Sequence, residues 1–127
     1  NNLTCDQIGV NVAANGTDGR IDAGNDIVAF SSSDITLKEN INPISNALDK
    51  VLSLGGYTFD WKKEREEEHG YTGSDIGVLA QEVEDILPTA VKDNCYGNKS
   101  VRMEKLIPLL IESIKELKEE VDTLKEK

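Results

Sequence analysis

The stretch 104–127, EKLIPLLIESIKELKEEVDTLKEK, decides the architecture because its apolar residues recur with the spacing of a coiled coil. Successive apolar positions lie three, four, three, four and three residues apart, at Ile107, Leu110, Ile114, Leu117, Val121 and Leu124. In a heptad this spacing places Ile and Val at the a positions and Leu at the d positions. An isolated helix of this length is marginal in water and needs apolar partners. We therefore predict a C-terminal coiled-coil helix over about 104–127.

The partner of this helix is left open by its pattern. Glu120 at a g position and Lys125 at the following e position suit a salt bridge between parallel chains. The apolar stripe is also narrow, which favours pairing with other chains over the alternative, an amphipathic helix folded back on its own domain. β-branched residues at a with Leu at d favour dimers, a preference at odds with the trimer expected below.

Working toward the N-terminus, residues 42–103 alternate between helical and strand patterns. The expected elements are a helix capped by Asn42 and stopped by Gly55-Gly56, strands over 57–61 and 76–79, a helix over 80–87, and a hairpin over 90–103. Residues 62–73 between the two strands form a charged excursion, and its charge run 62–68 is interpreted as a solvated hairpin, or alternatively as an arm that projects onto the upstream stalk. This mixture predicts a small α+β domain.

Residues 1–32 have a different character from the rest of the chain. Ile8, Val10 and Val12 alternate with small or polar neighbours, and Asn15-Gly16 and Asp18-Gly19 are turn dipeptides. We predict the end of a β-rich stalk whose faces are covered by identical chains, because so short a segment cannot bury a core alone. A disordered leader is the alternative. Since the chain begins with Asn rather than Met, we expect it to be part of a longer polypeptide.

Composition excludes several classes of function. The formal net charge of −10 argues against binding to nucleic acid or to an anionic membrane surface, and no apolar run is long enough for a membrane span. Cys5 and Cys95 fit neither a disulfide framework nor a metal-ligand spacing, so we interpret both as free thiols and expect no metal or cofactor. His69, the single histidine, lies in a charged loop where solvation is expected, which excludes a Ser-His-Asp triad.

The junction between the two parts reads Ser31-Ser32-Ser33-Asp34-Ile35-Thr36-Leu37-Lys38. Lys38 lies five positions after Ser33, which places the two side chains about 140° apart on a helix and on opposite faces of a strand. The two side chains can therefore meet only across a turn or bulge, or when Lys38 comes from another protomer. The plainer interpretation is that Ser33-Asp34 caps a turn and Lys38 is solvated.

Four blocks of residues resemble a known family in order and spacing. They are Ser33-Asp34-x-x-Leu37-Lys38-x-Asn40-Ile41, Tyr57-Thr58-Phe59-Asp60-Trp61, Ile76-Gly77-Val78-Leu79-Ala80-Gln81-Glu82-Val83, and the terminal helix from Leu106 with Ile114-Lys115-Glu116-Leu117. The chain from residue 33 resembles the C-terminal intramolecular chaperone domain of phage tail spikes, tail fibres, endosialidases and neck appendage proteins, also found in myelin regulatory factors. The chain departs from the family's pattern at two positions. The family often has Arg where this chain has Thr36, and Tyr where it has Met103.

The resemblance implies a trimeric, self-cleaving chaperone domain over 33–127, with 1–32 belonging to the product. Ser33 would be the nucleophile and Lys38 the general base for cutting the Ser32–Ser33 bond. Asp34 and Asn40 would support the reaction by orienting Lys38 or by donating a hydrogen bond to the oxyanion. The implied partners are two identical chains and the upstream β-stalk of the same polypeptide. The implied location is a virion precursor made in the host cytoplasm, and the chaperone domain is released from the mature particle. The rival interpretation is a non-catalytic trimerisation or receptor-tip module that stays attached.

Overall fold

The computed structural model describes residues 24–94 and 96–127. Most of the predicted stalk and both cysteines, Cys5 and Cys95, lie outside the described residues. Residues 24–34 are described as an irregular, exposed segment that forms no strand within the single chain.

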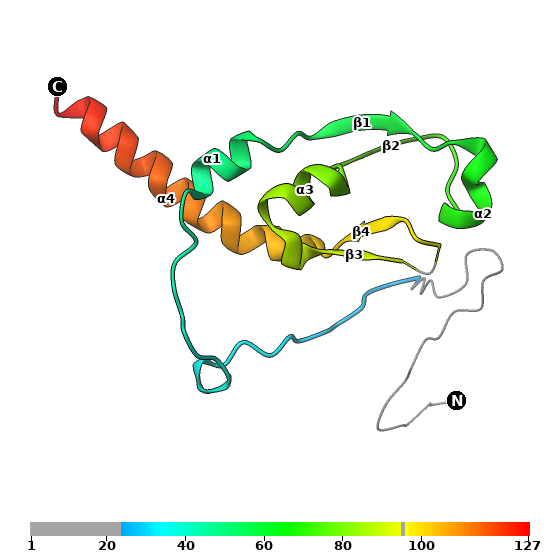
Figure 1. The fold of residues 1–127 in the computed structure, drawn as a ribbon, viewed down its shortest axis with the longest axis horizontal. Coiled ribbons are helices and arrows are strands. Elements are labelled where there is room, and N and C mark those ends of the chain that lie inside the picture. Colours follow the sequence, from blue (N-terminus) through cyan, green and yellow to red (C-terminus); the bar gives the residue numbers. More distant parts are fainter. Residues whose placement is uncertain (1–23, 95) are drawn as a thin grey trace.

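The described chain is a mixed α+β fold with short strands and one long C-terminal helix, as predicted (Figure 1). The helices are α1 (Ala47–Leu52), α2 (Glu66–His69), α3 (Ala80–Ile86) and α4 (Leu106–Lys125). The strands form two antiparallel pairs, β1 (Tyr57–Asp60) with β2 (Ser74–Gly77) and β3 (Val91–Asp93) with β4 (Lys99–Val101). Four 3₁₀ turns complete the order, η1 (Ile35–Leu37), η2 (Lys63–Arg65), η3 (Pro88–Ala90) and η4 (Met103–Lys105).

The first helix begins later than its sequence pattern predicts. Asn46 has a φ of 52°, and a residue in this left-handed conformation cannot continue a right-handed helix. Asn42 is not a cap, because its side-chain amide donates instead to the carbonyl of Asn40, 2.9 Å away. Helix α1 therefore starts at Ala47, and the prediction of a helix from Asn42 was wrong.

The second strand lies two residues earlier than expected. The β1–β2 register pairs Tyr57 with Gly77 and Asp60 with Ser74. The Ser74 hydroxyl donates to the Asp60 carboxylate at 2.6 Å, and this bond closes the end of the strand pair nearest α2. Pairing is complete by Gly77, after which the chain leads into α3, so residues 78 and 79 lie outside the strand.

The core of the described chain is small and draws its buried residues from α1, α3, η3 and α4. Ala47, Val83, Ala90 and Leu109 are the buried apolar residues, and burying a side chain the size of Leu contributes roughly 2 kcal/mol. Ser113 is the buried polar residue, and its hydroxyl donates to the Leu109 carbonyl one turn earlier, at 2.7 Å. The hydroxyl is therefore satisfied inside the helix.

Helix α4 uses two different faces. Leu109 and Ser113 face the chain's own domain and are buried, whereas the six heptad positions predicted above remain 38–66% exposed. Figure 1 shows the C-terminal end of α4 projecting beyond α1. The helix thus docks on its own domain, the alternative considered above, yet leaves the coiled-coil stripe uncovered in the single chain.

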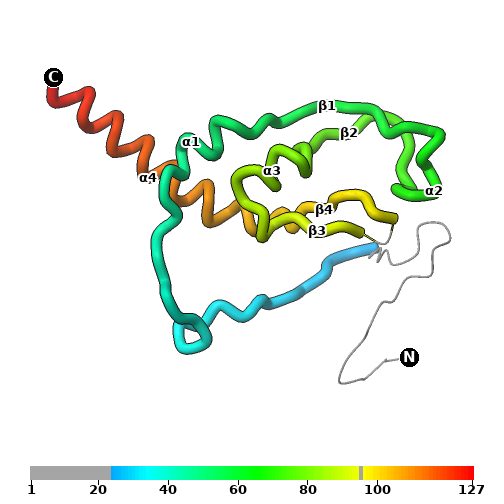
Figure 2. Tube along the Cα trace, in the orientation of Figure 1, coloured from blue at the N-terminus to red at the C-terminus, as the bar shows by residue number. Residues whose placement is uncertain are grey.

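The chain divides into a body and an arm. The body, residues 47–127, contains α1 through α4 and both strand pairs; the arm, residues 24–46, contains only η1. Figures 1 and 2 show the arm bowing away from the body before it returns at α1, with η1 as a small loop far from both strand pairs.

Candidate functional site

The turn η1 in the arm is organised by one carboxylate. Asp34 has extended backbone angles, φ −65° and ψ 135°, and occupies the N-cap position. Its Oδ1 accepts two hydrogen bonds from Thr36, one from the backbone N–H at 2.8 Å and one from Oγ1 at 2.7 Å. These two bonds lower the pKa of Asp34 below its ordinary value, because they favour the charged carboxylate.

The turn brings the two predicted catalytic side chains into contact. The Lys38 backbone N–H donates to the Ile35 carbonyl at 3.1 Å, and Lys38 itself has extended backbone angles. The ammonium of Lys38 then reaches back and donates from Nζ to Ser33 Oγ at 2.7 Å. A single chain therefore supplies both groups, and the five-residue separation is bridged by a turn, as the spacing requires.

The two residues predicted to support the pair, Asp34 and Asn40, make local contacts around the turn. Asp34 binds Thr36, and the carbonyl of Asn40 accepts from Asn42. Asn40 has a φ of 54°, a left-handed conformation that Asn tolerates better than most residues. Both residues thus shape the path of the chain on either side of Lys38 through contacts within the arm.

The turn is fully accessible to water in the single chain. Ser32, Ser33 and Lys38 are all exposed, and so are Ile35 and Leu37. A lysine becomes a general base when burial or neighbouring cations disfavour its ammonium form. Within the described part of one chain, nothing buries the turn. The geometry of a serine–lysine pair is therefore present without an enclosing pocket.

Two glutamates in the body hold its elements together, and the sequence patterns did not predict their roles. The Glu116 carboxylate on α4 accepts from the backbone N–H of Ala47 at 3.1 Å and of Leu48 at 2.6 Å. It thus caps the start of α1 from a position 69 residues away in sequence. Such a cap satisfies helix N–H groups that have no partner within the helix.

The second of these glutamates, Glu82 on α3, links two of the blocks that carry the family resemblance. Its carboxylate accepts from the Tyr57 hydroxyl at 2.8 and 3.0 Å and from the Gly55 N–H at 3.1 Å. The hydrogen bond to Glu82 raises the pKa of Tyr57. Glu82 and Glu116 both lie in the matched blocks, and this was the one sequence signal that could have drawn attention to them.

His69 is a structural residue in this fold. Its ring lies 4.8 Å from that of Trp61, and Tyr71 stacks on Trp61 at the same centroid distance. His69 Nδ1 accepts from the Tyr71 N–H at 3.0 Å, and Nε2 lies 2.8 Å from the Lys62 carbonyl. These contacts are satisfied when Nε2 carries the proton. The histidine is half-buried rather than solvated, and it lies in the body, away from the arm.

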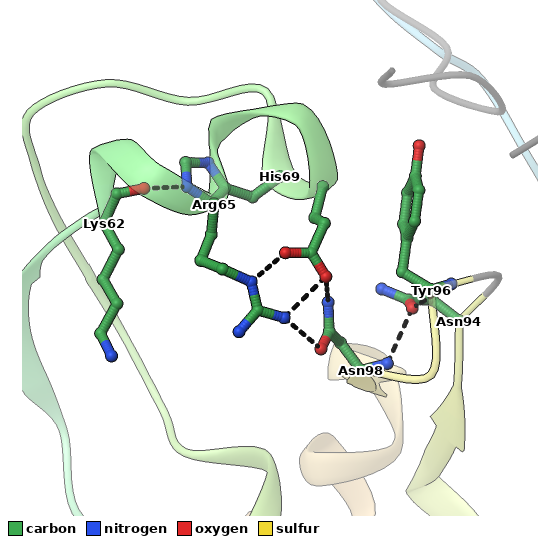
Figure 3. Close-up of polar contacts among 7 residues, drawn as sticks. Lys62, Arg65, His69, Asn94, Tyr96 and Asn98 are labelled. Atoms are coloured by element: carbon green, nitrogen blue, oxygen red, sulfur yellow. Dashed lines mark hydrogen bonds and ion pairs between the residues drawn. The ribbon is translucent and has the colours of Figure 1, made fainter. Parts of the chain in front are cut away.

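The charged segment 62–73 is tethered by its acidic side chains. Figure 3 shows the Arg65 side chain reaching Asn98 at the β3–β4 turn. Arg65 pairs with the Glu68 carboxylate, which also accepts from Asn98 Nδ2 at 3.1 Å. These bonds lower the pKa of Glu68 to about 2, with Arg65 as the largest cause. The segment is therefore two short helical turns held against a neighbouring hairpin.

The comparisons with known proteins identify the domain that begins at the turn. Residues 33–92 match a family model described as the chaperone of endosialidase, whose family name is that of a peptidase. The long tail fiber protein Gp37 of Enterobacteria phage K3 is 40% identical to this chain over 107 residues, covering 77% of this chain and 8% of that protein. Gp37 of Enterobacteria phage T2 gives the same values.

A third relative, Gp37 of Salmonella phage S16, is 38% identical over 73 residues, covering 56% of this chain and 10% of that protein. This chain thus spans less than a tenth of the length of the first two curated relatives, 8% in each. No described helix is both long and apolar enough to cross a membrane. The match begins at Ser33, the residue that Lys38 contacts across the turn. The segment that starts at this serine therefore belongs to the chaperone of endosialidase family.

Proposed function

We propose that residues 33–127 are a C-terminal chaperone that aligns three copies of a phage tail fibre protein and then cuts itself off between Ser32 and Ser33. The observation that carries the proposal is the 2.7 Å contact between Lys38 Nζ and Ser33 Oγ, at the first residue of the family match. The tail fibre relatives support a role in building an elongated fibre. On this proposal, residues 1–32 stay with the fibre as the end of its β-rich stalk.

A removable clamp suits the physics of intertwined β-structure. Pairing between distant segments is slow to nucleate, because loop-closure entropy opposes it, and Gly-rich strands slip in register. Holding three chains together at one end raises their effective concentration and fixes their alignment. Once the fibre has formed, its unfolding barrier keeps it assembled without the clamp. The clamp is then released from a particle precursor made in the host cytoplasm.

The cleavage begins with attack on the preceding peptide bond. Ser33 Oγ bonds to the carbonyl carbon of Ser32 through a five-membered ring, while Lys38 Nζ takes the hydroxyl proton. The Ser32–Ser33 C–N bond breaks, and its nitrogen receives that proton and becomes the new amino group. Water then opens the resulting ester, which leaves a carboxyl group on Ser32 and restores the Ser33 hydroxyl. Lys38 Nζ can accept the hydroxyl proton only as a neutral amine, because an ammonium group has no free lone pair.

We propose that assembly with other subunits buries the turn η1, which is exposed in a single chain. The exposed heptad stripe of α4 supplies the surface through which three chains join. Burial of η1 against another subunit would favour the neutral amine that the reaction needs. Cleavage would then occur only after the chains have been brought together, so that a chain does not lose its clamp early.

Gel electrophoresis of the purified chain tests the proposal directly. Self-cleavage gives fragments of 32 and 95 residues, and Ser33→Ala leaves the chain whole. Because one chain supplies both groups, mixed trimers of Ser33→Ala and Lys38→Ala chains should remain uncut. Cleavage in these mixed trimers would show instead that the pair forms between chains.

The second candidate is a non-catalytic trimerisation or tip module that stays attached. The exposure of η1 favours it, because a lysine in water is ordinarily protonated and so cannot accept the serine proton. This candidate predicts one intact band at every stage of assembly. Sedimentation of the intact Ser33→Ala chain measures the number of subunits under either proposal.

A further inference from the structure

The contact between Ser33 and Lys38 depends on a backbone turn that has little else to support it. Two backbone bonds close η1, from Leu37 N–H to the Asp34 carbonyl and from Lys38 N–H to the Ile35 carbonyl, both at 3.1 Å. A three-residue 3₁₀ turn has poor hydrogen-bond geometry and is weak by itself. Ile35 and Leu37 are 72% and 71% exposed, so no described apolar packing holds the turn.

The remaining support comes from two side-chain bonds at one oxygen. Asp34 Oδ1 accepts both the backbone N–H and the hydroxyl of Thr36. The first bond fixes the peptide that starts the turn, and the second adds a charge-assisted O–H donor. A long, unbranched lysine can reach Ser33 from many backbone conformations, but it remains there only if the turn keeps the two Cα atoms close.

We propose that Asp34 and Thr36 are positioning residues for the self-cleavage, and that the Thr36 hydroxyl locks the turn that presents Lys38 to Ser33. This inference rests on the proposed cleavage at Ser32–Ser33. Asp34 and Thr36 do not touch the reacting atoms. They restrict the backbone so that the amine lies beside the hydroxyl before the reaction starts, which removes an entropic cost from the transition state.

The test compares the cleavage rates of four variants with the cleavage rate of the unsubstituted chain. Asp34→Ala removes the acceptor, and we expect cleavage to slow by about tenfold to a hundredfold, since small misplacements of reacting groups cost that much. Thr36→Val removes only the hydroxyl and should slow cleavage by about threefold to tenfold. Thr36→Ser keeps the hydroxyl, and Asp34→Asn keeps an acceptor oxygen, so both should retain most of the rate.

Two controls separate positioning from damage to the fold. Thr123→Val removes an exposed threonine hydroxyl from α4, where it donates to the Glu119 carbonyl, and should leave cleavage unchanged. The melting temperature should stay constant in all four variants, because η1 lies outside the body.

Hydroxylamine, which cleaves an ester but not a peptide bond, should fail to restore the Asp34→Ala rate, since the slowed step is formation of the ester.

Three outcomes overturn the inference. Wild-type rates in both Asp34→Ala and Thr36→Val, with Ser33→Ala inactive, would show that the turn needs no lock while leaving the self-cleavage proposal intact. Full recovery of Asp34→Ala by hydroxylamine would assign Asp34 to ester hydrolysis. Cleavage in Ser33→Ala would remove the proposed function itself, and the positioning role with it.

Discussion

The body and the arm differ in how the chain holds its shape. In the body, contacts join residues far apart in sequence, such as Glu116 with α1 and Glu82 with Tyr57. In the arm, the hydrogen bonds of η1 described above join residues no more than five positions apart. Long-range contacts are lost together when a protein unfolds, whereas a local turn can open by itself. The proposed chemistry thus lies in the region that can open locally without unfolding the body.

The largest expected effect is loss of cleavage in the arm with no change in the stability of the body. Ser33→Ala should abolish cleavage, and Lys38→Met should slow it by about a hundredfold to ten-thousandfold, the range that a general base contributes. Because both side chains are exposed and outside the body, the melting temperature should not change. Time-resolved gel electrophoresis and thermal unfolding measure the two effects. A large loss of stability in either variant would contradict the division into body and arm.

The next effect is confined to the body. Leu109 is fully buried, so Leu109→Ala should lower the free energy of unfolding by about 2–5 kcal/mol through lost burial and a residual cavity. Chemical denaturation of the Ser33→Ala chain measures this without interference from cleavage.

Leu117→Ala is the matched control for the buried face of α4. Leu117 lies on the same helix but is 49% exposed, and it belongs to the heptad stripe. Its replacement should weaken association between chains in sedimentation while changing the unfolding of the isolated chain much less. Equal effects of the two substitutions on both properties would show that α4 does not have two distinct faces.

A smaller loss of stability is expected when the hydrogen bonds between α4 and α1 are removed. Glu116→Ala removes the carboxylate that caps Ala47 and Leu48, and should cost about 1–2 kcal/mol of stability, the range for loss of a helix cap. Glu116→Gln keeps one acceptor oxygen and should cost less. Glu119→Ala, an exposed change on the same helix, provides the control. Hydrogen exchange should show the loss of protection beginning in α1.

The smallest effect is a local response to acid. The pKa of Glu68 is about 2 in the fold, against an ordinary value of 4.5. A depressed pKa means that its bonds to Arg65 and Asn98 stabilise the fold above about pH 4.5 and are lost as the pH falls toward 2. Nuclear magnetic resonance of the β3–β4 amides should report this loosening. Glu68→Gln should remove the pH dependence in that window, and a persistent transition would assign it to another group.

Local sequence patterns were sufficient for elements whose cause is local. The strand at Tyr57–Asp60, the helix at Ala80–Ile86 and the hairpin of β3 and β4 follow from alternation, helical spacing and turn residues. The start of α1 was missed because Pro43 after Asn42 is a standard helix opening, whereas the left-handed conformation of Asn46 has no clear local signature. The roles of Glu82 and Glu116 could not be read from spacing, because both depend on how distant elements pack.

By itself, the sequence determined the α+β class, the family-like blocks from Ser33 onward and the apolar stripe of the last helix, because each is written in residues a few positions apart. Only the tertiary structure decided which face of α4 docks, since a helix with apolar residues on two sides can bury either one. It also decided that Lys38 lies beside Ser33 within one chain. Two residues five positions apart in sequence can lie in contact or apart, and only the folded turn η1 shows that these two are in contact.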